Sequence, residues 1–202
     1  MASILKVDTI QDQSGNNIIN ESGDTITIGA SGDTITIPTG ATLTVPNGGL
    51  SGQNYPAFEA YGSANQTGIS SGTWTKIAYN TERFDTNSMY DNSTNYRFTP
   101  TIAGKYFVYL QVAVFSETNF KLYVANGAIY KNGTRYLLNP NNANNTYPEN
   151  ERTISINAVI DMNGTTDYVE GYARGTVISG TVAISHGTLA ENTNFGAYRI
   201  GA

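Results

Sequence analysis

The sequence has 202 residues and contains no cysteine. Without thiols the chain cannot form disulfides, thiolate metal sites or cysteine nucleophiles. Small secreted domains usually depend on disulfides for their stability. The absence therefore favours folding in a reducing cytosol, or stabilisation by the association of several chains.

Charged residues are also scarce. They make up 13% of the chain, roughly half of the usual share. The net charge is −5 and there is no basic stripe, which argues against binding to nucleic acid or to anionic membranes. No segment approaches the ~20 apolar residues of a membrane span, and the N-terminus lacks the features of a signal peptide. We expect a soluble protein made in a cytoplasm, with no membrane insertion.

Groups that could carry catalysis are few. The single histidine, His186, lies at the end of a strand-like run, where a histidine is usually a surface or packing residue. No nucleophile elbow and no phosphate-binding lysine loop occur. Glu82 with Asp85, and Glu149 with Glu151, could form a glycosidase pair, but both pairs lie in polar, loop-like stretches where solvated charge is the default. We expect no catalytic residue and no enzyme activity.

One segment has a superficial likeness to a calcium loop. Residues 161–167, with the sequence DMNGTTD, contain two aspartates and an asparagine. The segment lacks the third ligand spacing and the terminal glutamate of an EF-hand. We interpret it as a turn between two strands, and we assign no metal site and no cofactor.

The composition that is present favours β structure. The apolar fraction is 39%, enough for a sizeable core, and the chain has 14 tyrosines and one tryptophan. Aromatic residues suit a pleated, half-buried surface. No helical period exceeds two turns. Many short strands separated by turns indicate an antiparallel sandwich or barrel; the strand-like runs are 58–61, 73–79, 97–99, 105–115, 121–125, 153–160, 168–173, 181–185 and 195–200.

A repeat occupies residues 22–48. The heptad SGDTITI at 22–28 recurs at 31–37, and a looser copy, ATLTV, follows at 41–45. Threonine alternates with a branched apolar residue, which is typical of a strand with one dry face. If three chains wind together, these apolar residues face a shared axis in a fibrous shaft; they are Ile26, Ile28, Ile35, Ile37, Leu43 and Val45. The alternative is a flexible linker, which the strict alternation of isoleucine disfavours.

The longest strand-like run, residues 105–115, is apolar on both faces. One face carries Tyr106, Val108 and Leu110, and the other carries Phe107 and Tyr109. A strand in a sheet that faces water would be polar on its outer side. The second face must therefore meet another sheet, the rest of the chain or a neighbouring subunit.

Several motifs resemble those of complement globular heads and of tumour necrosis factor. Residues 90–108, YDNSTNYRFTPTIAGKYFV, resemble the family's central signature. WTKI at 74–77, YKNG at 130–133 and FGAYRI at 195–200 resemble its early strand, its Lys-Asn-Gly turn and its closing strand. The resemblance implies an all-β, antiparallel jelly-roll head that forms a tight homotrimer. It also implies aromatic residues directed at the threefold axis, namely Phe107, Tyr109 and Tyr123. Some complement-type heads bind calcium near the trimer apex, and no residue is assigned to such an ion here.

The N-terminus resembles a different context. Residues 3–10, SILKVDTI, followed by a Ser-Gly-Asn turn, are similar to the opening of tail-fibre and other structural proteins of marine bacteriophages. The likeness implies a virion protein, assembled in the host cytoplasm, whose leader binds other virion proteins through Ile4, Leu5, Val7 and Ile10. A collagen tract, the usual partner of complement heads, is replaced by the β repeat. We expect a leader at 1–20, a shaft at 21–49 and a head at 50–202.

The segment 139–150 is long and rich in asparagine, and it is a candidate receptor loop. Its amides both donate and accept hydrogen bonds and its tyrosine could stack on a sugar; the residues are Asn141, Asn142, Asn144, Asn145 and Tyr147. The alternative is an ordinary solvated loop. We expect a trimeric phage fibre whose head recognises a host glycan or protein; a purely structural fibre or decoration protein, or a cellular complement-like lectin, are the alternatives.

Overall fold

The computed structural model describes residues 9–11, 13–15, 17–22, 25–29, 31–42, 55–143, 145–186 and 193–201. The chain divides into two units, residues 1–50 and residues 51–202. Within the described residues, all of the regular secondary structure is β-strand. In this part of the chain no helix could cross a membrane.

The first unit contains a small antiparallel sheet in the order β1-β2-β3. The strands are β1 (Thr9–Gln11), β2 (Asn17–Ser22) and β3 (Thr25–Ile28). The predicted turn between the first two strands is present, and Gly15 takes the positive φ of 85° that the turn requires. Because β2 begins before residue 20 and pairs with β3, one sheet joins the expected leader to the expected shaft.

The second copy of the repeat does not form the expected strand in the single chain. Residues 33–38 have no strand assignment. The described isoleucines of the repeat are exposed by between 46% and 67%, at positions 26, 28, 35 and 37. An isolated strand has neither ladder partners nor a dry surface to cover, so alternation alone cannot fix it. Leu43 and Val45 lie outside the described residues, and the trimeric shaft stays a prediction.

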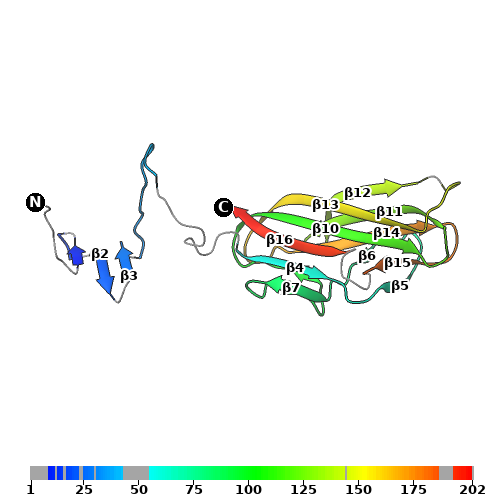
Figure 1. The fold of residues 1–202 in the computed structure, drawn as a ribbon, viewed down its shortest axis with the longest axis horizontal. Coiled ribbons are helices and arrows are strands. Elements are labelled where there is room, and N and C mark those ends of the chain that lie inside the picture. The colour runs from blue at the N-terminus through cyan, green and yellow to red at the C-terminus, as the bar shows by residue number, and fades with distance from the viewer. Residues whose placement is uncertain are drawn as a thin grey trace, which may run out of the picture. The chain divides into compact units, whose positions relative to one another are not determined.

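The second unit is built from two antiparallel sheets (Figure 1). The seven-stranded sheet has the order β5-β15-β10-β16-β4-β7, and β13 pairs along the other edge of β10, from Gly104 to Phe115. Its strands are β4 (Ala57–Tyr61), β5 (Gln66–Ile69), β7 (Thr81–Asp85), β10 (Gly104–Ser116), β13 (Glu151–Met162), β15 (Val182–Ser185) and β16 (Asn194–Gly201).

The six-stranded sheet has the order β12-β11-β14-β9-β8, and β6 also pairs with β14. Its strands are β6 (Thr75–Lys76), β8 (Tyr90–Asp91), β9 (Arg97–Phe98), β11 (Leu122–Lys131), β12 (Thr134–Asn142) and β14 (Val169–Val177). Figure 1 shows the long strands β10, β13, β11 and β14 running along the length of this unit. The predicted class, an antiparallel β-sandwich, is confirmed.

The core lies between the two sheets. On β10 the predicted inward face is buried, from Tyr106 to Val114 at every second residue. At one end of the core Phe58 stacks on Phe98 and Tyr90, with ring centroids 4.6 and 4.5 Å apart. Aromatic pairs of this kind bury large areas in specific geometry. The core is thus formed within one chain, and the outer faces of the two sheets are left out of it.

Candidate functional site

The outer face of the seven-stranded sheet carries an uncovered apolar row. In the strand register Phe107 is opposite Val159 on β13 and Tyr198 on β16, and Tyr198 is opposite Ala57 on β4. Residues directly opposite one another lie on the same face of a sheet. Val159 is 49% exposed and Tyr198 is 37% exposed, while the Phe107 and Tyr198 rings lie 5.5 Å apart. We call Val159, Phe107, Tyr198 and Ala57 the apolar row.

Tyr109 lies beside this row and is held by a polar network. Its side chain crosses Gly196, where a Cβ atom would meet the ring at 2.2 Å. Its hydroxyl donates to Glu59 Oε2 over 2.5 Å, and Arg83 pairs with Glu59 Oε1 at 2.9 Å. Burial, followed by the hydrogen bond to Glu59, raises the pKa of Tyr109 well above its usual value. The hydroxyl is therefore satisfied within the subunit, and the flat ring faces outward from the sheet.

Tyr123 does not lie with Phe107 and Tyr109. It belongs to β11, in the six-stranded sheet, whereas Phe107 and Tyr109 belong to β10 in the other sheet. The chain leaves one sheet after Ser116 and enters the other at Leu122, so alternation along the sequence cannot relate the two strands. The structure thus brings together only two of the three residues predicted for the trimer axis.

The residues predicted to attach the chain to a virion are described only in part. Ile4, Leu5 and Val7 lie outside the described residues. Ile10 lies on β1, opposite Ile19, which in turn is opposite Ile28. All three isoleucines are exposed in the single chain. A predicted attachment residue and a predicted axis residue therefore share one apolar row across this sheet.

The predicted receptor loop begins inside a strand. Asn141 and Asn142 are the last residues of β12, which pairs with β11, and the Asn141 side chain accepts a hydrogen bond from Arg152 over 2.5 Å. Asn144 lies outside the described residues. Asn145 and Tyr147 are exposed, Tyr147 by 78%. Among the described residues of the segment, the strand β12 ends at Asn142, and Glu149 forms a bridge to Leu122.

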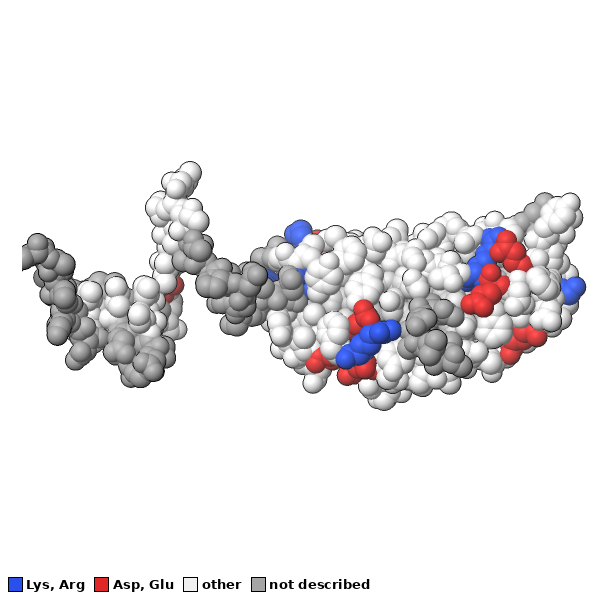
Figure 2. All heavy atoms as spheres, in the orientation of Figure 1, with Lys and Arg blue, Asp and Glu red and all other residues white. Residues whose placement is uncertain are grey.

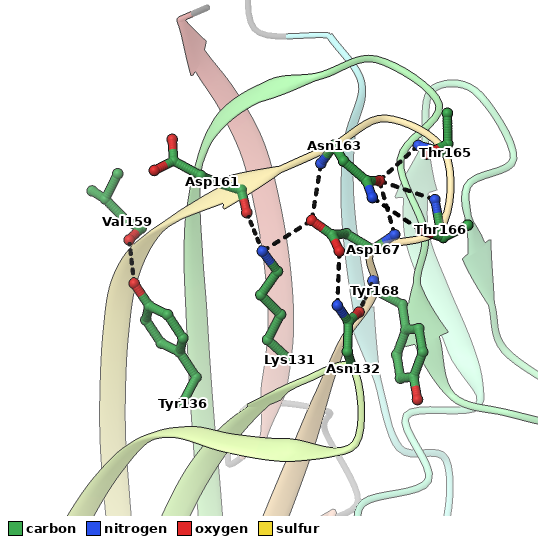
Figure 3. Close-up of polar contacts among 10 residues, drawn as sticks. All are labelled: Lys131, Asn132, Tyr136, Val159, Asp161, Asn163, Thr165, Thr166, Asp167 and Tyr168. Atoms are coloured by element: carbon green, nitrogen blue, oxygen red, sulfur yellow. Dashed lines mark hydrogen bonds and ion pairs between the residues drawn. The ribbon is translucent and has the colours of Figure 1, made fainter.

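The loop that resembles a calcium site is closed by a lysine (Figure 3). The ammonium of Lys131 lies 2.9 Å from Asp167 Oδ2 and 2.6 Å from the carbonyl oxygen of Asp161. Asn132 donates to Asp167 Oδ1 over 2.7 Å, and the Asn163 side chain accepts from three successive backbone amides. The hydrogen bond from Asn132, followed by those from Lys131 and from the backbone amide of Asn163, lowers the pKa of Asp167. The predicted turn is confirmed, and an ammonium stands between the oxygens that a cation would need.

Two of the other titratable candidates, Glu149 and His186, have structural partners. Glu149 pairs with Arg152 at 2.5 Å, and that hydrogen bond lowers the pKa of Glu149. His186 is fully buried, and its Nδ1 lies 2.7 Å from Thr193 Oγ1. Glu82 lies on β7, where burial, with Asp85 nearby, raises its pKa. Among the residues that the structure describes, no group of three or more His, Cys, Asp or Glu is placed to hold a metal ion.

Charged side chains of the second unit gather in small mixed clusters. In the view of Figure 2, red and blue groups lie next to each other within each cluster, and a wide uncharged expanse separates the clusters. This agrees with the five ion pairs among the described residues, all of which join side chains of this unit. Uncharged surface therefore dominates this view.

Comparisons with known proteins identify the fold. No protein-family model matches the chain, and no curated protein matches it. A crystal structure of murine APRIL at pH 5.0 has a TM-score of 0.51 at 9% identity, and the match covers 72% of this chain and 98% of that chain. Murine APRIL at pH 8.5 has a TM-score of 0.46 at 10% identity with the same coverage. The first of these two matches shows that the second unit has a jelly roll like that of tumour necrosis factor, as its motifs predict.

Proposed function

We propose that this chain is the subunit of a homotrimeric bacteriophage fibre, a structural protein of the virion assembled in the host cytoplasm. In this proposal residues 1–20 bind other virion proteins, residues 21–49 form the shaft, and the jelly-roll head points outward. The head serves in binding rather than catalysis and needs no cofactor. The phage context rests on the likeness of residues 3–10 to fibre leaders.

The observation that carries the proposal of a trimer is the apolar row. A sheet that faces water is normally polar on its outer side, yet Val159 and Tyr198 are exposed there beside the aromatic ring of Phe107. One chain already forms the core inside the sandwich, so the folding of a single chain does not bury this apolar surface. Association of three heads through this face would bury the row, in the assembly that the motif resemblance implies.

The exposed isoleucines of the first unit support the same assembly. Ile10, Ile19 and Ile28 form one row across three strands, and Ile35 and Ile37 follow it in the sequence. A ribbon this thin cannot cover such residues by itself. Three copies around an axis would give each isoleucine an apolar neighbour and leave the threonines in water.

The mass of the full chain in solution tests the trimer. We expect light scattering to give three times the 21.7 kDa of one chain at micromolar concentration. A mass of one chain would contradict the proposal. Immunogold labelling of intact virions tests the context separately, because a particle without label would reject the virion assignment.

Recognition of a host surface is favoured over a purely structural role by the exposed end of the candidate receptor loop. Tyr147 projects into solvent with 78% of its surface exposed, and Asn145 and Glu149, which pairs with Arg152, lie two residues from it in the sequence. A large exposed aromatic side chain in a polar loop is a common contact for a partner. The test is binding of the fluorescently labelled chain to host cells. Binding that is lost in Tyr147→Ser would support recognition. A wild-type chain that binds no cells would favour the purely structural fibre.

A further inference from the structure

The outer face of the six-stranded sheet carries an aromatic cluster that the sequence motifs do not explain. Tyr130 on β11 and Tyr172 on β14 stack with ring centroids 4.1 Å apart and an interplanar angle of 29°. Trp74, just before β6, lies 6.3 Å from Tyr130. All three side chains are half-buried, so each ring is partly open to solvent. Trp74, Tyr130 and Tyr172 are called the aromatic cluster below.

Three arginine side chains lie on the same face as this cluster. The guanidinium of Arg135 lies 5.6 Å from the Trp74 ring, and that of Arg97 lies 4.5 Å from the ring of Tyr168. On β14 the inward positions are taken by Gly171, Ala173 and Gly175, which face core side chains. Arg174 therefore points to the same outer face as Tyr172.

The three arginines of this face have no carboxylate partner among the described residues. Glu170 is buried at the centre of the face, but it pairs with Lys76 at 2.6 Å. The carboxylate of Asp91, opposite Arg97, accepts hydrogen bonds from the turn that follows it. Both negative charges thus have their own partners. In a chain with a net charge of −5, this face is a local concentration of unpaired positive charge.

Arg174 adds an independent indication of a ligand. Its Nε atom is buried, and it finds no hydrogen-bond acceptor in the part of the chain that the structure describes. A buried donor without a partner costs free energy, more so when the group is charged. Such atoms in native proteins usually meet water, an ion or a ligand.

We propose that this face binds an anionic polysaccharide, whose sugar rings lie on the aromatic cluster and whose carboxylate or sulfate groups pair with Arg97, Arg135 and Arg174. The planar guanidinium fork matches a carboxylate or sulfate with two parallel hydrogen bonds. The partly open aromatic rings offer apolar surface to the C–H groups of a pyranose. The proposal rests on the proposed role of the head in recognising a host surface, and it names the class of ligand.

The site remains available in the proposed trimer. The apolar row lies on the outer face of the seven-stranded sheet, whereas the aromatic cluster lies on the outer face of the other sheet. The core separates the two faces, so assembly through the first leaves the second in solvent. Each subunit of a trimer would then present one copy, and multivalent contact with a polymer would increase the apparent affinity.

Isothermal titration of the full chain with defined oligosaccharides tests the proposal. The probes are a mannuronate hexamer, a sulfated dextran oligomer and a neutral dextran oligomer of the same length. We expect the two anionic probes to bind, more weakly as salt is added, and the neutral probe to bind much less. Arg135→Gln and Arg97→Gln should each weaken binding about tenfold, as expected for loss of a charge-assisted hydrogen bond.

Two further variants separate the site from general electrostatics and from folding. Lys105→Gln removes one positive charge on β10, where Lys105 is exposed and pairs with Asp161, and should leave binding unchanged. Trp74→Phe retains a ring and should bind better than Trp74→Leu, with both variants melting as cooperatively as the wild type. The proposal would be overturned if Lys105→Gln and Arg135→Gln lost affinity for the anionic probes equally. It would also be overturned if the neutral probe bound as tightly as the anionic probes. A chain that is trimeric but binds no anionic probe would refute this site alone, whereas a monomer that binds would refute only the trimer.

Discussion

At the scale of single residues, the polar group of Tyr109 is held by partners that are distant in the sequence. The hydroxyl of Tyr109 reaches Glu59, which Arg83 holds from the other side. Sequence reasoning could place Tyr109 on the outer face of its strand, because alternation fixes the face. It could not find Glu59 or Arg83, since these residues lie about fifty and twenty-five positions away and come together only through the β10-β16-β4-β7 order.

Substitution of Tyr109 should separate the contribution of its hydroxyl from that of its ring. Tyr109→Phe should lower the free energy of unfolding by about 1.5 kcal/mol, since it removes one hydrogen bond to a charged group. Tyr109→Ala should cost about 3–5 kcal/mol, because it uncovers the apolar surface around Gly196. Chemical denaturation gives both values. Tyr147→Phe, at an exposed position, is the control and should not change stability; a Tyr109→Phe variant equally unaffected would contradict the hydrogen bond.

His186 should make the head sensitive to mild acid. Burial lowers its pKa from the ordinary 6.5 to about 4, so the unfolded chain binds a proton more readily than the folded chain. The free energy of unfolding is therefore highest above pH 6.5 and declines as the pH falls towards 4. Below pH 4 it is lower by about 3 kcal/mol. Most carboxylates are still ionised between pH 6.5 and 5, which isolates the histidine in that range.

Urea denaturation across this pH range measures the effect. The wild-type chain should lose stability steadily from pH 6.5 to pH 5, whereas His186→Gln should show a flat profile there. A similar slope in both proteins would assign the pH dependence to other groups.

At the scale of elements, the sequence predicts strands best where alternation and apolar content agree. Residues 105–115 show both properties, and β10 follows them closely. The strand β12 was missed, because asparagine and proline dominate its second half and both residues favour turns in isolation. There the pairing with β11 overrides local preference. The aromatic cluster was missed for a related reason, since its three rings come from three separate segments.

The repeat is the element for which local pattern and single-chain structure differ. β3 forms by pairing with β2, whereas the identical heptad at 31–37 forms no strand. The same sequence thus behaves differently according to whether a partner strand is available. A shared axis of three chains would supply that partner, which makes the second heptad a sensitive indicator of assembly.

Ile35→Asp should disrupt the shaft and spare the head. In a single chain Ile35 is 61% exposed, so a carboxylate there would cost little; on a shared axis it would place three unpaired charges together in a dry environment. We expect faster proteolysis within residues 21–49 and an unchanged melting temperature of the head. Thr34→Asp, on the predicted wet face, is the matched control. An Ile35→Asp shaft as resistant as the wild type would show that Ile35 does not face an axis.

At the scale of the whole molecule, the two outer faces of the head have different surface chemistry. One sheet presents the apolar row, with the Glu59–Arg83 pair towards its β7 edge and the Lys105–Asp161 pair on β10 and β13. The other presents aromatic rings among arginines. A division of this kind allows self-association and ligand binding to occur on opposite sides of one sandwich. The two proposed functions should therefore be separable by substitution.

Val159→Lys tests the apolar row at the level of assembly. Because Val159 is 49% exposed in the single chain, a lysine can extend into solvent and should scarcely change the stability of one subunit. In a trimer that buries the row, three ammonium groups would lose their hydration without a partner. The variant should therefore be a folded monomer, whereas Thr134→Lys, at an exposed position on the other sheet, should remain a trimer. Melting temperature measured across a hundredfold concentration range distinguishes them, since only an assembly that dissociates on unfolding melts higher when concentrated. A Val159→Lys chain that keeps the wild-type mass and concentration dependence would show that the row stays in solvent.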